Sequence, residues 1–299
     1  MRTVDGEPFF LPTSLSTGPG LMARMLELLD VRDGHRVLEI GTGTGYNAAL
    51  LCHRLGADSV VSIDIDPDLV DQARQRLAAI GYEPALVAGD GEVGVPDMAP
   101  YDRVIATAVV PAVPLAWMDQ LAPDGVIVVN IRGELCTGPV CVLTKTRGER
   151  RLTGRFPQLG GHFMWSRPLP DNPLRPHEYR PVRRSTDVSE GRTTLDPTGI
   201  IDDQAIRFLL QLRLHGAESF YRFGDTVTVL ASDSSRADVD GGGVVRQSGP
   251  RRLWDTVEVT ERLYTELRRP PLDHYSITVT PSEQYISLGD RHRWPLPLV

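Results

Sequence analysis

The chain has 299 residues, of which 41% are hydrophobic and 24% charged, and its formal net charge is −7. This composition is that of an ordinary globular protein with one large domain, or a common-sized domain and a second unit. The negative charge argues against a nucleic-acid partner, and no apolar stretch is long enough to span a bilayer. Neither a signal peptide nor a metal site is expected, and three sparse cysteines are typical of a reducing cytoplasm.

From Leu21 to about Lys145 the sequence alternates between amphipathic and continuously apolar segments. Continuous apolar strands separated by helices indicate a parallel sheet covered on both faces. We therefore predict an α/β fold for residues 1–150, with a Rossmann-like, doubly wound and mostly parallel sheet. Helices are predicted over residues 21–29, 46–56, 67–81 and 117–121, and strands over residues 36–40, 59–65, 84–90, 101–110 and 125–131.

The pattern changes after about Arg150. Residues 166–200 are rich in Pro, Arg and Ser, which predicts a linker or a draped segment over residues 151–200. Periodicity then returns and predicts a smaller α+β unit over residues 201–299. Its expected elements are helices over residues 201–214 and 252–269, a strand over 225–231, a flexible loop over 232–243 and a hairpin over 275–288.

The stretch VLEIGTGTGYNAA (37–49) places three glycines on alternate positions between a strand and a helix. A phosphate, a dinucleotide or a sulfonium cofactor can each bind at such a turn. The spacing differs from the dinucleotide fingerprint G-x-G-x-x-G, and no Lys-Ser/Thr follows, which excludes a P-loop. A compact ligand without phosphates, such as S-adenosylmethionine, fits this turn, because its amino-acid carboxylate suits a helix N-terminus.

Two acidic residues follow the next two predicted strands. Asp64 lies about 20 residues beyond the glycines, where a carboxylate can accept hydrogen bonds from both ribose hydroxyls. Asp90, in AGDG, can accept a hydrogen bond from the adenine amino group. Either residue alone could be a helix cap or a solvated carboxylate, but together with the glycines they indicate an adenosyl cofactor.

The segment from Leu21 to about Ile131, with the few residues before it, resembles the protein-L-isoaspartate (D-aspartate) O-methyltransferase family. The matching segments are STGPGLMARMLELL, RVLEIGTGTGYNAALL, VAGDG and YDRVIATAVVPAVPLAWMDQLAPDGVIVV. The resemblance implies a class I fold that depends on S-adenosyl-L-methionine and releases S-adenosyl-L-homocysteine. The cofactor contacts that we predict are Glu39, Gly41, Thr42, Gly43, Gly45, Asp64, Ile65, Gly89, Asp90 and Gly91.

The family's Ser-x-Pro beside the substrate carboxylate maps onto Thr17-Gly18-Pro19. By this resemblance Thr17, or its neighbour Ser16, holds the carboxylate oxygens, and Gly18 and Pro19 contact substrate. An alternative is that Thr17 is a helix N-cap. The substrate carboxylate is already ionised at neutral pH, so no general base is needed. Residues at the carboxyl end of the fourth strand are predicted to line the substrate crevice, unless they form an ordinary loop; they are Thr107, Ala108, Val109 and Val110.

Two departures from the family affect the expected substrate. Only sixteen residues precede Thr17, which leaves open a truncated start or a site completed by a neighbouring subunit. The chain also continues for about 150 residues beyond the predicted sheet. Its end, DHYSITVTPSEQYISLGDRHRWPL, resembles methyltransferases of ribosomal-peptide maturation (graspetides, lanthipeptides, lasso peptides).

We therefore expect methylation of an Asp or isoAsp side chain in a precursor peptide, which the C-terminal unit would recognise. The methyl ester could then collapse to a succinimide. General isoaspartyl repair, a small-molecule methyltransferase and a non-catalytic peptide-binding module are the alternatives. Arg180, Arg183 and Arg184 could hold an acidic peptide or form a solvated surface.

Overall fold

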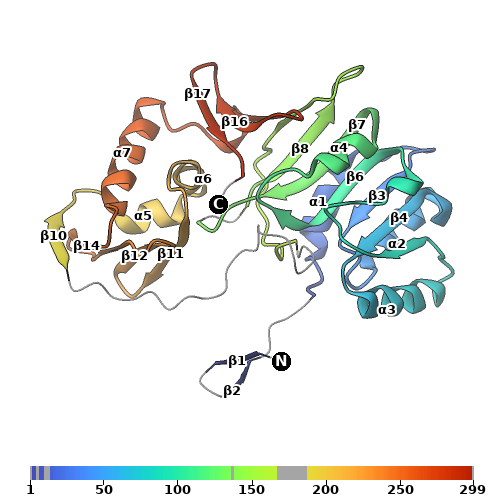
Figure 1. Cartoon of the computed structure of the whole chain (residues 1–299), viewed down its shortest axis with the longest axis horizontal. Coiled ribbons are helices and arrows are strands. Elements are labelled where there is room, and N and C mark those ends of the chain that lie inside the picture. Colours follow the sequence, from blue (N-terminus) through green and yellow to red (C-terminus); the bar gives the residue numbers. More distant parts are fainter. Residues whose placement is uncertain (1, 5–6, 10–13, 136–137, 167–186, 298–299) are drawn as a thin grey trace.

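A computed structural model describes residues 2–4, 7–9, 14–135, 138–166 and 187–297 (Figure 1). They form one large sheet with helices on its faces, a smaller sheet with its own helices, and a short N-terminal hairpin. The hairpin pairs β1 (Arg2–Val4) with β2 (Glu7–Phe9). Within these ranges, the helices are too short or too polar to cross a bilayer.

One half of the large sheet is parallel, as the sequence predicts. Its strands lie in the order β5–β4–β3–β6–β7, and each neighbouring pair is parallel. The chain winds outward from β3 to β5 and then returns to the other side of β3, so the winding direction reverses beside β3. The elements are β3 (Val37–Ile40), β4 (Val60–Asp64), β5 (Ala85–Ala88), β6 (Tyr101–Val110), β7 (Leu121–Ile131), α1 (Pro19–Leu29), α2 (Tyr46–Leu55), α3 (Pro67–Ala78), α4 (Leu115–Gln120), η1 (Ala57–Ser59) and η2 (Pro96–Met98).

Both faces of this half are covered, because successive strand residues point to opposite sides. Val37 belongs to a buried cluster with Met25 of α1 and Leu51 of α2. Its neighbour Leu38 belongs to a second cluster with Trp117 of α4. This second cluster continues into the C-terminal part of the chain, so the two parts share one apolar core.

The other half of the large sheet is antiparallel and contains strands that the sequence analysis missed. β8 (Val140–Lys145) pairs with β7, and β9 (Leu152–Arg155) pairs with β8. The hairpin predicted over residues 275–288 is confirmed, as β15 (Tyr275–Val279) and β16 (Gln284–Leu288). β15 pairs with β9, and β17 (His292–Pro295) forms the far edge.

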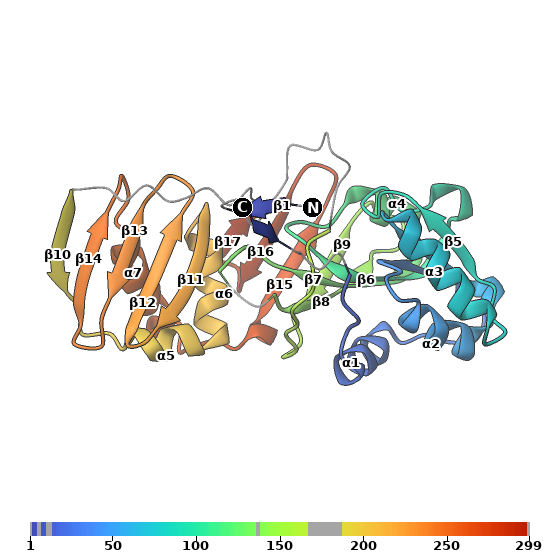
Figure 2. The ribbon, with the colours of Figure 1, turned by 90° about the horizontal axis from the view of Figure 1, so that it is seen from below.

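The smaller sheet is antiparallel, in the order β10–β14–β13–β12–β11, with helices beside it (Figure 2). The first of these helices, α5, ends at Asp202, and the side chain of Asp203 then caps α6 by accepting from Ala205 N. The elements are β10 (Val188–Arg192), β11 (Ala217–Phe223), β12 (Thr226–Ala231), β13 (Arg236–Val239), β14 (Val244–Ser248), α5 (Pro197–Asp202), α6 (Gln204–Arg213), α7 (Leu253–Glu266) and η3 (Leu272–His274).

The capped helix expected over residues 201–214 is present as α6, but it begins at Gln204, because α5 ends at Asp202 and Asp203 caps α6. Two other expectations for this part were wrong. Residues 232–243 are a turn, strand β13 and a second turn, because Ala237 and Val239 alternate with polar residues and are buried. Part of the expected linker, residues 188–192, is strand β10.

The C-terminal part is joined to the large sheet by aromatic and amide contacts. The ring of Phe208 (α6) lies 5.2 Å from that of Phe156 and 5.3 Å from that of Tyr275 (β15). Strands β15, β16 and β17 also belong to the large sheet, which contains segments from both sides of the boundary proposed near residues 150–160. The division into 1–150, 151–200 and 201–299 stays a prediction about separate roles. Arg180, Arg183 and Arg184 lie outside the described residues.

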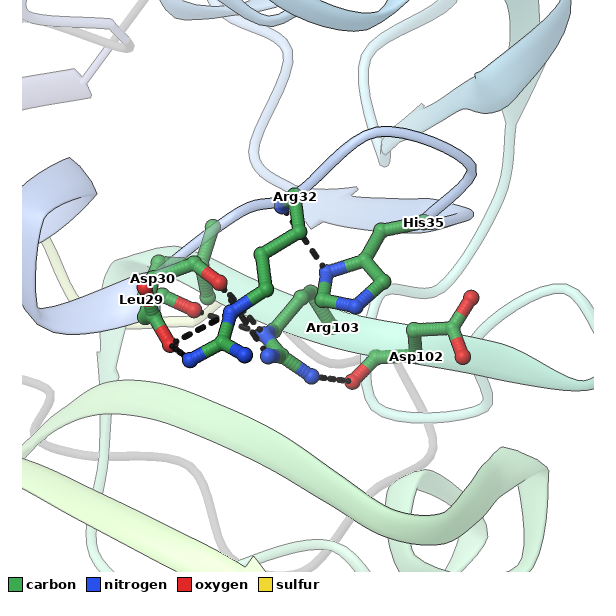
Figure 3. Close-up of polar contacts among 6 residues, drawn as sticks. All are labelled: Leu29, Asp30, Arg32, His35, Asp102 and Arg103. Carbon is green, nitrogen blue, oxygen red and sulfur yellow. Dashed lines mark hydrogen bonds and ion pairs between the residues drawn. The ribbon is translucent and has the colours of Figure 1, made fainter.

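A buried arginine connects α1 to the sheet (Figure 3). Arg103 of β6 donates from Nε to Leu29 O at 2.7 Å and from a terminal nitrogen to Asp30 O at 3.1 Å. These carbonyls end α1 and have no partners within the helix. Asp30 in turn accepts from Arg32 at 2.7 Å. Arg103 thus fixes the C-terminal end of the helix whose N-terminal end carries Gly18 and Pro19.

Replacing Arg103 with methionine should lower the free energy of unfolding by about 2 kcal/mol, because it leaves buried carbonyls without a donor. Chemical denaturation of the two proteins measures the difference. Arg24→Met, at an exposed ion pair with Glu27 on the same helix, is the control and should change stability by less than about 0.5 kcal/mol. Equal effects of the two substitutions would contradict this role for Arg103.

A candidate active site at the carboxyl ends of the central strands

The glycine turn lies directly after β3, beside the point where the winding direction reverses. Gly41 has a φ of 94°, and a Cβ on it would lie 2.7 Å from Thr107 Oγ1. Thr107 Oγ1 donates to Gly41 O at 2.9 Å, which ties the end of β6 to the turn. Only glycine fits this close approach. On the other side, a Cβ on Gly43 would lie 3.3 Å from Ser14 Oγ, so the segment before α1 crosses over the turn.

Asp64 at the end of β4 orients the glycine turn. Its Oδ2 accepts from Gly43 N at 2.9 Å, and its Oδ1 accepts from Asp66 N at 3.1 Å. The side chain is largely buried and lines the cavity described below. Because a carboxylate has more acceptor positions than these two bonds use, Asp64 can still accept from hydroxyl groups of a ligand.

Glu39, two residues before Gly41, is fully buried beneath the turn. It accepts from Asn47 Nδ2 at 2.8 Å and from Ser62 Oγ at 2.6 Å. The pKa of Glu39 is raised to about 7, mainly by burial and to a smaller extent by the nearby Asp64, and these hydrogen bonds oppose the change. Asn47 Oδ1 is buried and has no donor among the described residues. Both side chains line the cavity, which therefore contains acceptors suited to a ligand with a positive charge.

The third acidic turn lies at the end of β5. Asp90 Oδ1 accepts from Glu92 N at 2.9 Å, and Gly89 N donates to Asp64 O at 2.9 Å. Gly91 lines the cavity and its carbonyl accepts from Trp117 Nε1 at 2.8 Å, whereas Gly89 and Asp90 do not line it. Burial raises the pKa of the Glu92 carboxyl, although its hydrogen bond with Ser166 opposes this change.

The segment before α1 forms another wall of the cavity. Ser16, Thr17 and Gly18 line it, and Pro19 begins the helix. The N-cap of α1 is Gly18, and α1 has no side-chain capping bond. The alternative that Thr17 caps this helix is therefore wrong, and Thr17 is part of the cavity wall.

The end of β6 and a later segment complete the enclosure. Thr107 and Ala108 line the cavity, whereas Val109 and Val110 are buried in the core and do not. Residues 162–166 form a wall that the sequence analysis missed, because they fall in the segment expected to be a linker. The apolar run HFMW (162–165) within that polar segment was the available signal.

Together these walls enclose a cavity of about 280 Å³. Of the predicted site residues, the structure brings together Ser16, Thr17, Gly18, Glu39, Gly41, Thr42, Gly43, Asp64, Ile65, Gly91, Thr107 and Ala108. Gly45 instead has a φ of 81° and begins α2 as its N-cap. Cavity residues that the sequence analysis missed include Ser14, Tyr46, Asn47 and Trp165. In the described ranges, no three His, Cys, Asp or Glu side chains are grouped as metal ligands.

The fold and this turn define a class of protein. Class I S-adenosyl-L-methionine-dependent methyltransferases have this arrangement. Their parallel sheet carries a glycine turn after its central strand and a carboxylate at the end of the next strand. The residues fit such a cofactor, because the close glycine approach leaves room for it and Asn47 Oδ1 and Glu39 offer acceptors to its positively charged end.

Comparison with known proteins identifies the family. A sequence model described as protein-L-isoaspartate(D-aspartate) O-methyltransferase matches residues 12–150. Protein-L-isoaspartate O-methyltransferase 1 of Archaeoglobus fulgidus is 41% identical over 158 residues, which are 51% of this chain and 72% of that protein. The Methanoculleus marisnigri protein of the same name is 44% identical over 49% of this chain and 68% of its own length. The chain belongs to this family, and it is a methyltransferase that depends on S-adenosyl-L-methionine.

A solved structure extends the likeness beyond the matched region. A structure entitled protein-L-isoaspartate O-methyltransferase aligns with 96% of this chain and 84% of its own, with a TM-score of 0.51 and 23% identity. The Thermotoga maritima relative is 36% identical over 53% of this chain and 51% of its own length. The C-terminal part is therefore a fold that a solved protein shares, although the sequence suggested a departure from the family.

The pKa of Glu39 predicts a pH-dependent stability. Its folded pKa, about 7, is above the ordinary value of 4.5, so the folded state binds this proton more tightly than the unfolded state. The free energy of unfolding of the wild type, minus that of Glu39→Gln, should therefore fall by about 3 kcal/mol as pH rises from about 5 to 8. Chemical denaturation across this range measures it, with the exposed Glu149→Gln as the control for loss of one charge. A constant difference between wild type and Glu39→Gln would contradict the prediction.

Proposed function

We propose that this protein transfers a methyl group from S-adenosyl-L-methionine to the carboxylate of isoaspartyl residues in proteins and peptides. The observation that carries the proposal is the shared cavity. Asp64 and the glycine turn line one part of it, and the hydroxyl-bearing residues Ser16 and Thr17 line another. A cofactor and a carboxylate acceptor would thus meet in one cavity, as the names of the relatives imply.

The cofactor would be held by groups at the ends of the first three parallel strands. Asp64 would accept from the ribose hydroxyl groups, and Asp90 with Gly91 would contact the adenine. Asn47 Oδ1 and Glu39 would face the positively charged amino-acid end. When bound, S-adenosyl-L-methionine supplies an electrophilic methyl group on a positively charged sulfur.

The acceptor carboxylate needs no general base, because it is ionised at neutral pH. Thr17, with Ser16 beside it, would donate a hydroxyl hydrogen bond that orients one carboxylate oxygen. Residues 162–166 and the segment before α1 would exclude water, which weakens solvation of the carboxylate and favours its attack. The chain's contribution to catalysis is therefore orientation and desolvation.

General isoaspartyl methylation is favoured over a dedicated precursor peptide. The matched relatives are named for isoaspartate, and a solved structure with such a title aligns with the C-terminal part as well. The C-terminal part also contributes strands to the large sheet, so its presence has a structural explanation. Recognition of a precursor peptide by residues 201–299, and succinimide formation on it, remain the second candidate. A non-catalytic binding module is disfavoured by the intact cavity.

Unrelated short peptides that contain isoaspartate should accept labelled methyl groups from this protein, whereas matched peptides with normal aspartate should not. The difference is expected because the family acts on the isoaspartyl geometry. Methylation of an unrelated peptide set, measured as base-labile methyl ester, is the test. Turnover of normal aspartate in one peptide, with none of the isoaspartyl peptides modified, would favour the precursor-peptide alternative. No methylation at all, with no cofactor binding by calorimetry, would favour the binding module.

Asp64→Ala should weaken binding of S-adenosyl-L-homocysteine about 10- to 100-fold, because charged hydrogen bonds to ribose contribute about 1.5–3 kcal/mol. Thr17→Val should leave this dissociation constant within about twofold and lower kcat for an isoaspartyl peptide instead. Calorimetry and steady-state kinetics measure the two effects. Asp68→Ala, an exposed residue in the first turn of α3, is the control for Asp64. An unchanged dissociation constant in Asp64→Ala would show that the ribose is held elsewhere.

A further inference from the structure

Residues 162–166 form a wall of the cavity whose position is fixed by the main chain. Val109 N donates to Met164 O at 2.8 Å, and Ser166 N donates to Val109 O at 2.8 Å. Trp165 is thereby paired with Val109 in a parallel bridge and lines the cavity. A side chain that contacts Trp165 therefore has a defined position beside the site.

Arg132 is such a side chain. It follows the last residue of β7, and its backbone N donates to Val110 O at 3.3 Å. Its guanidinium carbon lies 5.0 Å from the centroid of the Trp165 ring. Stacking of this kind holds an arginine in a fixed orientation and leaves the hydrogen-bond donors at its edge available.

The donors of Arg132 are not used within the described parts of the chain. Its Nε is buried without a partner, and its guanidinium forms no ion pair there. Arg103 is different, because carbonyl oxygens of Leu29, Asp30 and Asp102 accept from its nitrogens. A buried donor without an acceptor is unfavourable unless a ligand supplies one.

The charges around the cavity are divided. Carboxylates lie on the cofactor side at Glu39, Asp64 and Asp90, and the carboxyl of Glu92 is held by a hydrogen bond with Ser166 in the wall. On the other side, burial lowers the pKa of His162, and the charges of Arg132 and Arg207 lower it further. Arg207 donates to Leu135 O at 3.1 Å. Among the described residues, Arg132 places a fixed positive charge against Trp165, and its Nε has no acceptor there.

We propose that Arg132, stacked on Trp165, is a specificity-determining residue that binds a second carboxylate of the substrate peptide. This inference rests on the proposed function. That carboxylate belongs to an acidic residue flanking the isoaspartate or to the peptide's own C-terminus. It is not the reacting group, because an arginine bonded to the methyl acceptor would withdraw charge from the attacking oxygen. Arginine is suited to this contact because its planar edge matches a carboxylate with two hydrogen bonds.

The test uses three isoaspartyl peptides of one length and the whole protein. The first has neutral flanking residues and an amidated end, the second has glutamate next to the isoaspartate and an amidated end, and the third has neutral flanks and a free C-terminal carboxylate. Wild type should show kcat/KM about five- to tenfold higher for the second or third peptide than for the first. Which of the two is favoured identifies the source of the carboxylate. The ratio should fall towards one in Arg132→Gln and, in wild type, at high salt.

Arg293→Gln is the matched control, because Arg293 stacks on Tyr285 at 4.6 Å in the β16–β17 hairpin. This variant should keep the wild-type ratio. Binding of S-adenosyl-L-homocysteine to Arg132→Gln, followed by calorimetry, shows whether the variant retains a folded cofactor site. A ratio of one in wild type, or a preference that persists in Arg132→Gln, would overturn the inference while the proposed function stands. Failure of wild type to methylate every isoaspartyl peptide would overturn both.

Discussion

The hydrogen bond from Gly43 N to Asp64 Oδ2 joins the ends of the two strands on which the site is built. It requires that the backbone after β3 pass within reach of the end of β4, which the left-handed conformations of Gly41 and Gly43 allow. The same turn contacts Thr107 of β6 on its other side. Three strands that are distant in sequence therefore meet at one short segment of main chain. The walls of the cavity are built around this glycine turn after β3.

The C-terminal part of the chain stabilises the loops on the acceptor side of that site. Gln284 of β16 accepts from Val113 N at 2.9 Å and donates to Val113 O at 2.7 Å, which fixes the loop after β6. Gln211 of α6 accepts from Leu135 N at 2.5 Å, which fixes the loop after β7. The first loop follows β6, which carries Thr107, and the second follows β7 and begins with Arg132. The C-terminal part thus has a structural role at the site, in addition to any part in recognising a substrate.

The distribution of charge suits the two ligands of a methyl transfer. A cofactor with a positively charged sulfur and ammonium group would meet Glu39, Asn47 Oδ1 and Asp64. The peptide, which contributes a carboxylate, would meet hydroxyl groups and the imidazole of His162. The acidic groups on the cofactor side would attract its positively charged ligand, and the carboxyl of Glu92 is held by a hydrogen bond with Ser166 in the wall that contains residues 162–166.

The sequence by itself determined the parallel half of the sheet and the position of the cofactor turn. Both depend on local signals, namely continuous apolar strands, the spacing of Gly41, Gly43 and Gly45, and acids directly after strands. Asp64 and Gly91 could be placed beside the glycines because the ends of parallel strands meet at one edge. Only the tertiary structure decided the wall at residues 162–166, the partners of Asn47 and Arg132, and the burial of Val109. The wall and the stacking of Arg132 depend on the bridge between Val109 and Trp165, and the partner of Asn47 is a buried side chain of β3. Contacts between segments that are separate in the sequence leave no periodic signal within any one of them.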